Sequence, residues 1–177
     1  MKQQILTLLV IVYFFCFCSG CAPEYRKLNS SGYRKVQAKD YEGAFKDFDA
    51  SIKSNNTYWL AYLNRGASYA REGNCKKAVD DFYTSISLHP KNPLAFDNLG
   101  LCKMELGDSI GACSAFTQAV KLDKNFDIAF THLGMLLARM DSCLSAVYYL
   151  EVALQKKAFD QCHDEKEVLR LRKKCSQ

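Results

Sequence analysis

The sequence predicts an all-α fold, an α-solenoid of four helix pairs closed by a C-terminal helix. Glycine recurs at a step of 34 residues. The residue 12 positions after each of these glycines is alanine, and four positions further lies phenylalanine or, in the last copy, leucine. Small and large residues that keep one phase through four copies indicate a repeated pair of closely packed helices. The repeated glycines are Gly32, Gly66, Gly100 and Gly134.

The composition fits this fold and argues against one class of function. The chain has 177 residues, of which 49% are apolar and 24% charged, so we expect one domain with an ordinary core. The formal net charge is +5, and the basic residues are scattered except near Arg170–Lys174. Nucleic-acid-binding proteins gather positive charge on one face, so we do not expect a nucleic-acid partner.

Residues 1–21 have the composition of a secretory signal. Lys2 precedes an unbroken apolar run at Ile5–Phe17, and small residues follow this run. The run is shorter than the roughly 20 residues that a membrane-spanning helix needs. The sequence therefore favours an exported protein, with an uncleaved signal anchor as the alternative.

The end of this signal, Ser19-Gly20-Cys21, resembles the lipidation site of a bacterial lipoprotein. Cys18 stands where leucine is usual in that family. The resemblance implies that Cys21 carries acyl chains and anchors the protein to a membrane of the cell envelope. Ala22 after the cysteine favours the outer membrane by analogy with lipoprotein sorting. Cleavage just before Ala22 would instead give a secreted protein.

Helices are expected on both sides of a short polar turn in every copy. Gly73 and Gly107 suit the left-handed conformation that closes a first helix. Asn92 and Pro93 suit the start of the helix that opens the third copy. The expected N-cap residues of the four second helices are Asp40, Asn74, Asp108 and Ser142.

A 34-residue period with these small and aromatic positions resembles the tetratricopeptide repeat. The resemblance covers about Tyr25–Lys157 and implies antiparallel helix pairs that stack into a superhelix. Residues 22–157 would then hold four repeats, at about 25–58, 59–92, 93–126 and 127–157. Ser31 and Lys35 replace apolar residues that are usual in the family, so the first repeat is expected to be the least stable.

In tetratricopeptide arrays the first helices line a concave groove. The resemblance therefore implies an apolar, methionine-containing groove that binds an extended or amphipathic segment of a protein partner. Members that grip a peptide carboxylate use Lys and Asn, but here Leu63 and Asp97 replace the lysine beside Asn64 and Asn98, so that clamp is not expected. Packing between repeats is the alternative role for any one residue. The candidate groove residues are Tyr33, Leu60, Leu63, Asn64, Asp97, Asn98, Leu101, Met104, Ile128, Thr131, Met135 and Arg139.

Residues 158–177 depart from the period and are expected to form a capping helix and tail. From Asp164 onward, Val168, Leu171 and Cys175 lie at helical spacing on one face. Acidic residues in the first turn and basic residues in the last suit the helix dipole. A helix of this kind would cover the last repeat, as such arrays require. Contact of its basic end with lipid headgroups is the alternative.

Six cysteines follow the signal, an even number that permits disulfides in an exported chain. In the repeat that the sequence resembles, the start of a second helix approaches the end of the next first helix. This arrangement implies Cys75–Cys102 and Cys143–Cys175 as the pairs, if disulfides form. The alternative is that all six cysteines are free, small buried side chains.

The sequence has no motif for catalysis. It contains no glycine-rich phosphate loop, nucleophile elbow or HExxH motif, and its cysteines and histidines lack the spacing of a zinc site. We therefore expect no enzyme activity, no catalytic residue, no cofactor and no metal. The leading hypothesis is a lipid-anchored adaptor that binds a partner protein in the envelope. The alternative is an accessory or regulatory subunit of a cell-envelope enzyme.

Overall fold

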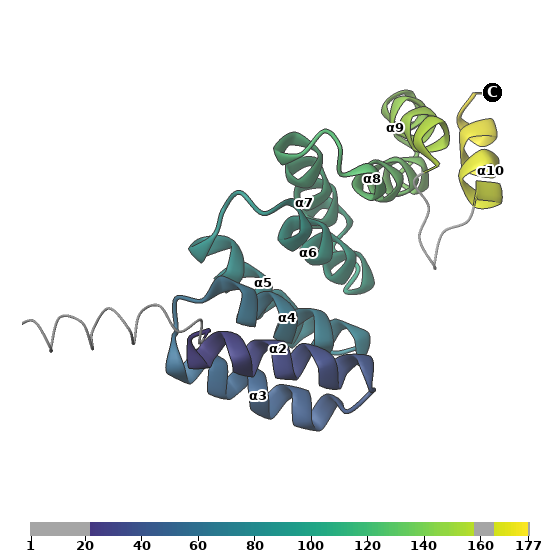
Figure 1. Ribbon diagram of the computed structural model, residues 1–177. Helices are drawn as coiled ribbons and strands as arrows, with labels where there is room; N and C mark the ends of the chain where they lie inside the picture. Colours follow the sequence, from purple (N-terminus) through teal and green to yellow (C-terminus); the bar gives the residue numbers. More distant parts are fainter. Residues whose placement is uncertain (1–21, 158–164, 177) are drawn as a thin grey trace, which may run out of the picture.

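A computed structural model describes residues 22–157 and 165–176 of the chain. The described residues form helices joined by short turns (Figure 1). The predicted lipidation site Cys21 lies outside them. The helices are α2 (Glu24–Gln37), α3 (Tyr41–Ser54), α4 (Trp59–Arg71), α5 (Cys75–Leu88), α6 (Pro93–Glu105), α7 (Ser109–Leu122), α8 (Asp127–Arg139), α9 (Cys143–Lys156) and α10 (Glu165–Cys175).

The helices form four pairs stacked in chain order, so the predicted all-α solenoid is confirmed (Figure 1). The pairs are α2 with α3, α4 with α5, α6 with α7, and α8 with α9, and the two members of each pair pack extensively. Each second helix also packs against the first helix of the next pair. Among the described residues, no helix is long and apolar enough to cross a membrane.

The core lies where a glycine of the first helix faces a large side chain of the second. A Cβ atom added to Gly32, Gly66 or Gly100 would lie 2.5–2.8 Å from the phenylalanine ring of the same repeat. In the fourth repeat Gly134 faces Leu150 in the same way. Only a glycine lets the two helices approach this closely, which explains the 34-residue step. The large side chains Phe48, Phe82, Phe116 and Leu150 are fully buried.

In each repeat, the turn between the two helices contains one residue in the left-handed conformation. Gly73 and Gly107 have φ of +75° and +81°, as expected from the sequence. Lys39 and Asp141 occupy the same position in the first and last repeats and have φ of 62° and 55°. The left-handed conformation is unfavourable for a non-glycine residue. The close contacts of the paired helices therefore hold the turn in this conformation in the two end repeats.

The N-caps follow the prediction in three of the four repeats. The side chains of Asp40, Asn74 and Asp108 each accept a hydrogen bond from the backbone N–H three residues later. Ser142 occupies the same position but makes no such bond. Asn92 accepts from the N–H of Leu94, with proline as the first helical residue.

Charged residues at unusual positions form ion pairs that join neighbouring helices. Arg65 on α4 donates to both carboxylate oxygens of Asp81 on α5, at 2.6 and 2.8 Å, and to Asp49 on α3 at 2.5 Å. The hydrogen bond with Asp81 is the largest of the effects that raise the pKa of Arg65. In the first repeat the Lys35 ammonium lies 2.8 Å from the Asp47 carboxylate. These ion pairs therefore link neighbouring helices at positions where an apolar side chain would otherwise pack.

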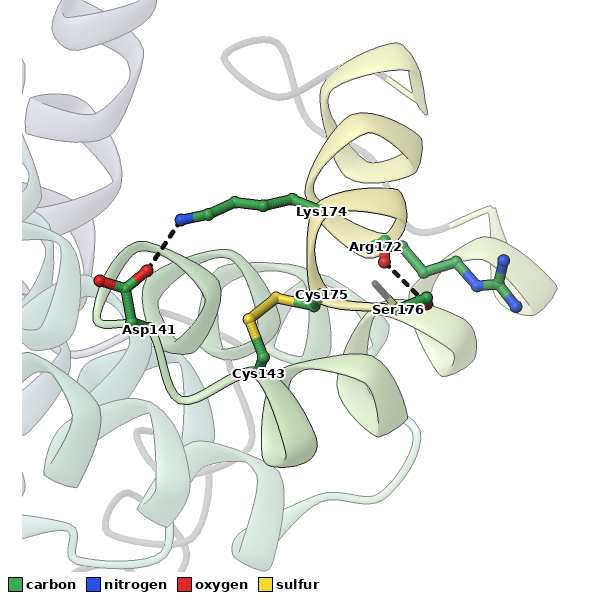
Figure 2. The surroundings of a disulfide bond; sticks show 6 residues. All are labelled: Asp141, Cys143, Arg172, Lys174, Cys175 and Ser176. Atoms are coloured by element: carbon green, nitrogen blue, oxygen red, sulfur yellow. Dashed lines mark hydrogen bonds and ion pairs between the residues drawn. A yellow bond between two sulfur atoms is a disulfide. The ribbon is translucent and has the colours of Figure 1, made fainter.

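Helix α10 packs against α9 and α8 and closes the C-terminal end, as predicted (Figure 1). Val168 and Leu171 on α10 are buried against Met135 of α8 and Leu150 of α9. A disulfide between Cys143 and Cys175 joins the start of α9 to the end of α10 (Figure 2). This helix takes the place that the first helix of a further pair would occupy.

Candidate binding face

The four first helices form one side of the solenoid, which we call the inner face. Among the described helices, α2 contacts α4, and α4 contacts α6. Successive second helices, such as α3 and α5, do not pack against each other to a comparable extent. Helices α6 and α8 are linked through the side chains of Asp97 and His132. The array therefore curves toward its first helices, so that the inner face is the concave side.

Four of the expected groove residues are buried, and their assignment to an open surface is wrong. Leu63 is only 3% exposed because it packs with Ala95 and Leu99 of the next repeat. Met135 is 2% exposed because α10 covers it. Asp97 and Thr131 are also buried. An exposed strip through Leu63, Leu101 and Met135 therefore does not exist, because Leu63 packs between repeats and Met135 packs beneath α10.

A repeated polar link between first helices explains part of this burial. The amide of Asn64 donates to the side-chain oxygen of Asn29 at 3.0 Å. His132 Nδ1 and Asp97 Oδ1 are 2.8 Å apart, with both side chains buried. Each link joins residues 35 positions apart, and the second link lies two 34-residue steps after the first, so one joins the first and second repeats and the other joins the third and fourth in the same way. Polar groups at these positions are therefore engaged with each other rather than presented to a ligand.

The remaining residues of the inner face are accessible in varying degree. Tyr33 on α2 is 52% exposed, and Leu94 near the start of α6 is 45% exposed. Leu94 was missed in the sequence, although it lies one 34-residue step from the predicted Leu60 and Ile128. Arg139 is exposed at the C-terminal end of the face. The half-buried members are Leu60, Asn64, Asn98, Leu101, Met104 and Ile128.

A basic pocket lies where α8 meets α10. It has a volume of about 460 Å³ and is lined by Arg139, Arg170, Leu171 and Lys174. Lys174 forms an ion pair with Asp141 at 2.8 Å (Figure 2). Arg170 forms an ion pair with Glu167, also at 2.8 Å. Because both pairs are exposed to solvent, they hold these cations only weakly.

Four of the described cysteines form two pairs at corresponding places in the array. Cys143 and Cys175 form the disulfide at the C-terminal end. Cys75 and Cys102, the other expected pair, are buried free thiols in one cluster of the core, so no bond joins them in this structure. Cys113 is a half-buried free thiol on α7. The described residues contain no group of His, Cys, Asp or Glu that could hold a metal ion.

One repeat of the chain matches a known family model. Residues 95–126 match the model described as tetratricopeptide repeat. The four stacked helix pairs, closed by the C-terminal helix, have the all-α solenoid fold of tetratricopeptide proteins, and one of the repeats matches the model of that family. No curated protein sequence matches the chain.

Solved structures of tetratricopeptide proteins share the fold. YrrB, described as having an unusual peptide-binding site, has 18% sequence identity and a TM-score of 0.67, and the match covers 84% of this chain and 82% of YrrB. The Sgt2 domain from Aspergillus fumigatus has 24% identity and a TM-score of 0.64, over 68% and 81% of the two chains. The first such domain of Spaghetti (RPAP3), solved with an HSP90 peptide, has 16% identity and a TM-score of 0.65, over 67% and 94%. At these identities the likeness shows the fold alone.

Proposed function

We propose that this protein is a non-enzymatic adaptor that binds a segment of a partner protein along its inner face. The observation that carries the proposal is the series of accessible apolar side chains on successive first helices. Tyr33 lies on α2, Leu60 on α4, and Leu94, Leu101 and Met104 on α6. Solved structures of the same fold are described as peptide-binding or as bound to a peptide, which supports this use of the surface.

The chemistry of the face favours an apolar segment. Burying apolar surface contributes about 25 cal/mol per Å², and a few well-placed large side chains usually dominate such binding. The most exposed of them, Tyr33 and Leu94, come from the first and third repeats. A partner that covers both must lie across the intervening helix α4, so an extended or helical segment fits better than a single side chain.

The test is a selection of binding peptides on the purified protein, followed by substitution of Leu94. Leu94→Asp places a charge on the inner face, where desolvating it would oppose binding. The change lies in the first turn of α6, where an acidic residue suits the helix dipole, so the fold should survive. We expect at least a tenfold weaker affinity for the selected peptides, measured by calorimetry.

Leu122→Asp is the matched control for this test. Leu122 is 39% exposed and ends α7, a second helix, so the same charge falls outside the inner face. It should leave peptide affinity unchanged. Equal binding by wild type and Leu94→Asp would show that the inner face is not the binding surface.

We further propose that Cys21 is lipidated and holds the adaptor on a membrane of the cell envelope. The support is the sequence Ser19-Gly20-Cys21 behind a short apolar run. Two or more acyl chains give stable anchoring, whereas one gives only marginal binding. In cells fed a radioactive fatty acid, wild type should incorporate label and Cys21→Ser should not. Equal labelling of the two would overturn the lipid anchor while leaving the binding function standing.

A further inference from the structure

The free thiols of Cys75 and Cys102 occupy the same places as the cysteines of the existing disulfide. Cys75 is the first residue of α5, and Cys143 is the first residue of α9, two 34-residue steps later. Cys102 is the tenth residue of α6, and Cys175 is the eleventh residue of α10. Helix α6 packs on α5 as α10 packs on α9. The two pairs are therefore equivalent, although only one of them is bonded.

The unbonded pair lies within one buried part of the core. Cys75 and Cys102 belong to one buried cluster with Leu99 and Phe82, between the second and third repeats. Burial, and then the neighbouring Cys75 thiol, raise the pKa of the Cys102 thiol. Cys75 acts on this pKa through a side-chain hydrogen bond and through charge, and both effects weaken with distance.

We propose that Cys75 and Cys102 are a site of disulfide formation, oxidised by a disulfide donor such as glutathione disulfide or a thiol–disulfide oxidoreductase. The closed bond links α5 to α6 and so fixes the second repeat to the third. It is the internal counterpart of the bond that fixes α10 to the fourth repeat. The proposal does not depend on what the inner face binds.

The reaction proceeds in two exchanges that balance. The Cys75 sulfur, as thiolate, attacks one sulfur of the donor and releases the first donor thiol, which leaves a mixed disulfide on Cys75. Cys102 then loses its proton to solvent and attacks the Cys75 sulfur, which releases the second donor thiol. The protein dithiol loses two electrons and two protons, and the donor disulfide gains both.

Burial assigns the order of the two steps. Cys75 is 8% exposed in the first turn of its helix, whereas Cys102 is 1% exposed in the last turn of α6. A donor therefore reaches Cys75 first, after local opening of that turn. Both exchanges require a thiolate, and the raised pKa of Cys102 slows the second of them near neutral pH, so closure quickens as the pH rises.

The test follows oxidation of the full-length chain by glutathione disulfide, with peptide mapping by mass spectrometry. The chain is first fully reduced, so that re-formation of Cys143–Cys175 serves as an internal control. We expect a cross-linked peptide pair containing Cys75 and Cys102, formed several times faster at pH 9 than at pH 7. Cys102→Ser should instead trap the glutathione adduct on Cys75, and Cys113→Ser should leave the cross-link unchanged.

Three results would overturn the proposal. The first is full alkylation of Cys75 and Cys102 under conditions in which Cys143–Cys175 re-forms. The second is a cross-link from Cys75 to any other cysteine. The third is a closure rate independent of pH, because both exchanges require a thiolate. In a chain with Cys143→Ser and Cys175→Ser, the oxidised form should unfold at a higher urea concentration than the reduced form, and equal midpoints would remove the structural role.

Discussion

The first and last repeats of the solenoid each have one side without a neighbouring repeat, and they differ in the contacts that stabilise them. An end repeat has a neighbour on one side only, so part of its apolar surface must be avoided or covered. The first repeat has a small apolar cluster of Val36, Ala44 and Phe48, flanked by Tyr41. In the last repeat, nine residues of α8 are buried, and α10 covers the outer side.

Polar contacts hold the first repeat where apolar contacts and a disulfide hold the last. Ser51 donates to the backbone oxygen of Tyr25 at 2.7 Å, and Lys35 pairs with Asp47. Each such contact stabilises the fold by about 1 kcal/mol or less, which is small beside the burial of a large apolar side chain. The comparison indicates that the chain should unfold from its N-terminal end, in line with the sequence-based expectation for the first repeat.

The largest expected effect comes from removing a core phenylalanine. Phe116→Ala should cost about 3–5 kcal/mol, because the ring is fully buried against Gly100. Phe48→Ala removes the same contact in the first repeat, where few other apolar contacts remain. We expect it to unfold α2 and α3 alone, as shown by loss of hydrogen-exchange protection confined to these helices. If both variants lose protection throughout the array, the first repeat is not a separate unit.

The next largest effect is expected from removing the disulfide at the C-terminal end of the solenoid. Replacing Cys143 and Cys175 by serine should cost about 2–4 kcal/mol, since the bond constrains a loop with a sequence separation of 32 residues. Hydrogen exchange of α10 should rise most, because the bond joins this helix covalently to the start of α9. Cys113→Ser is the control and should change nothing in α10. An α10 that stays protected without the bond would show that Val168 and Leu171 are sufficient to hold it.

A smaller difference in stability is expected between alanine substitutions of Asn64 and Asn98, two asparagines at the same repeat position. Asn64→Ala removes the donor to buried Asn29 and should cost about 1–2 kcal/mol in urea denaturation, because an amide oxygen loses its partner. Asn98 lies 34 residues later, where the residue matching Asn29 is the apolar Leu63. Asn98→Ala should therefore change stability by less than about 0.5 kcal/mol. Equal losses would mean that the polar link does not stabilise the first repeat.

The smallest expected effect is a loss of stability at acidic pH. Burial acts to raise the pKa of Asp47, but Lys35 and Ser31 outweigh it and lower this pKa. A carboxylate with a lowered folded-state pKa stabilises the protein above its unfolded-state pKa of about 3.9, and this contribution disappears as the pH falls through the folded-state value. We expect less than about 1 kcal/mol, seen as faster hydrogen exchange in α2 below pH 4. Lys35→Met should weaken this pH dependence, because Ser31 still lowers the pKa of Asp47, and an unchanged dependence would assign the effect to another group.

The regular features of the fold could be predicted because they depend on local chemistry. A glycine facing a phenylalanine, an Asp or Asn at an N-cap, and a glycine in a left-handed turn each require a particular residue type at a fixed position. The inner face was less predictable. Leu63 and Leu101 both lie on first helices and were both expected to line the groove, yet Leu63 is buried and Leu101 is half-buried.

The sequence by itself determined the period, the helix pairs, their caps and the small and large positions of the core, because helix geometry turns spacing into a face. Only the tertiary structure decided which residues of the inner face are accessible, since α10 covers Met135 and the next repeat covers Leu63. It also decided that Arg65 joins three helices, and that Asp97 meets His132 rather than a ligand. These outcomes depend on contacts between residues far apart in the chain, whose distances are set by the stacking of whole repeats and not by any local pattern.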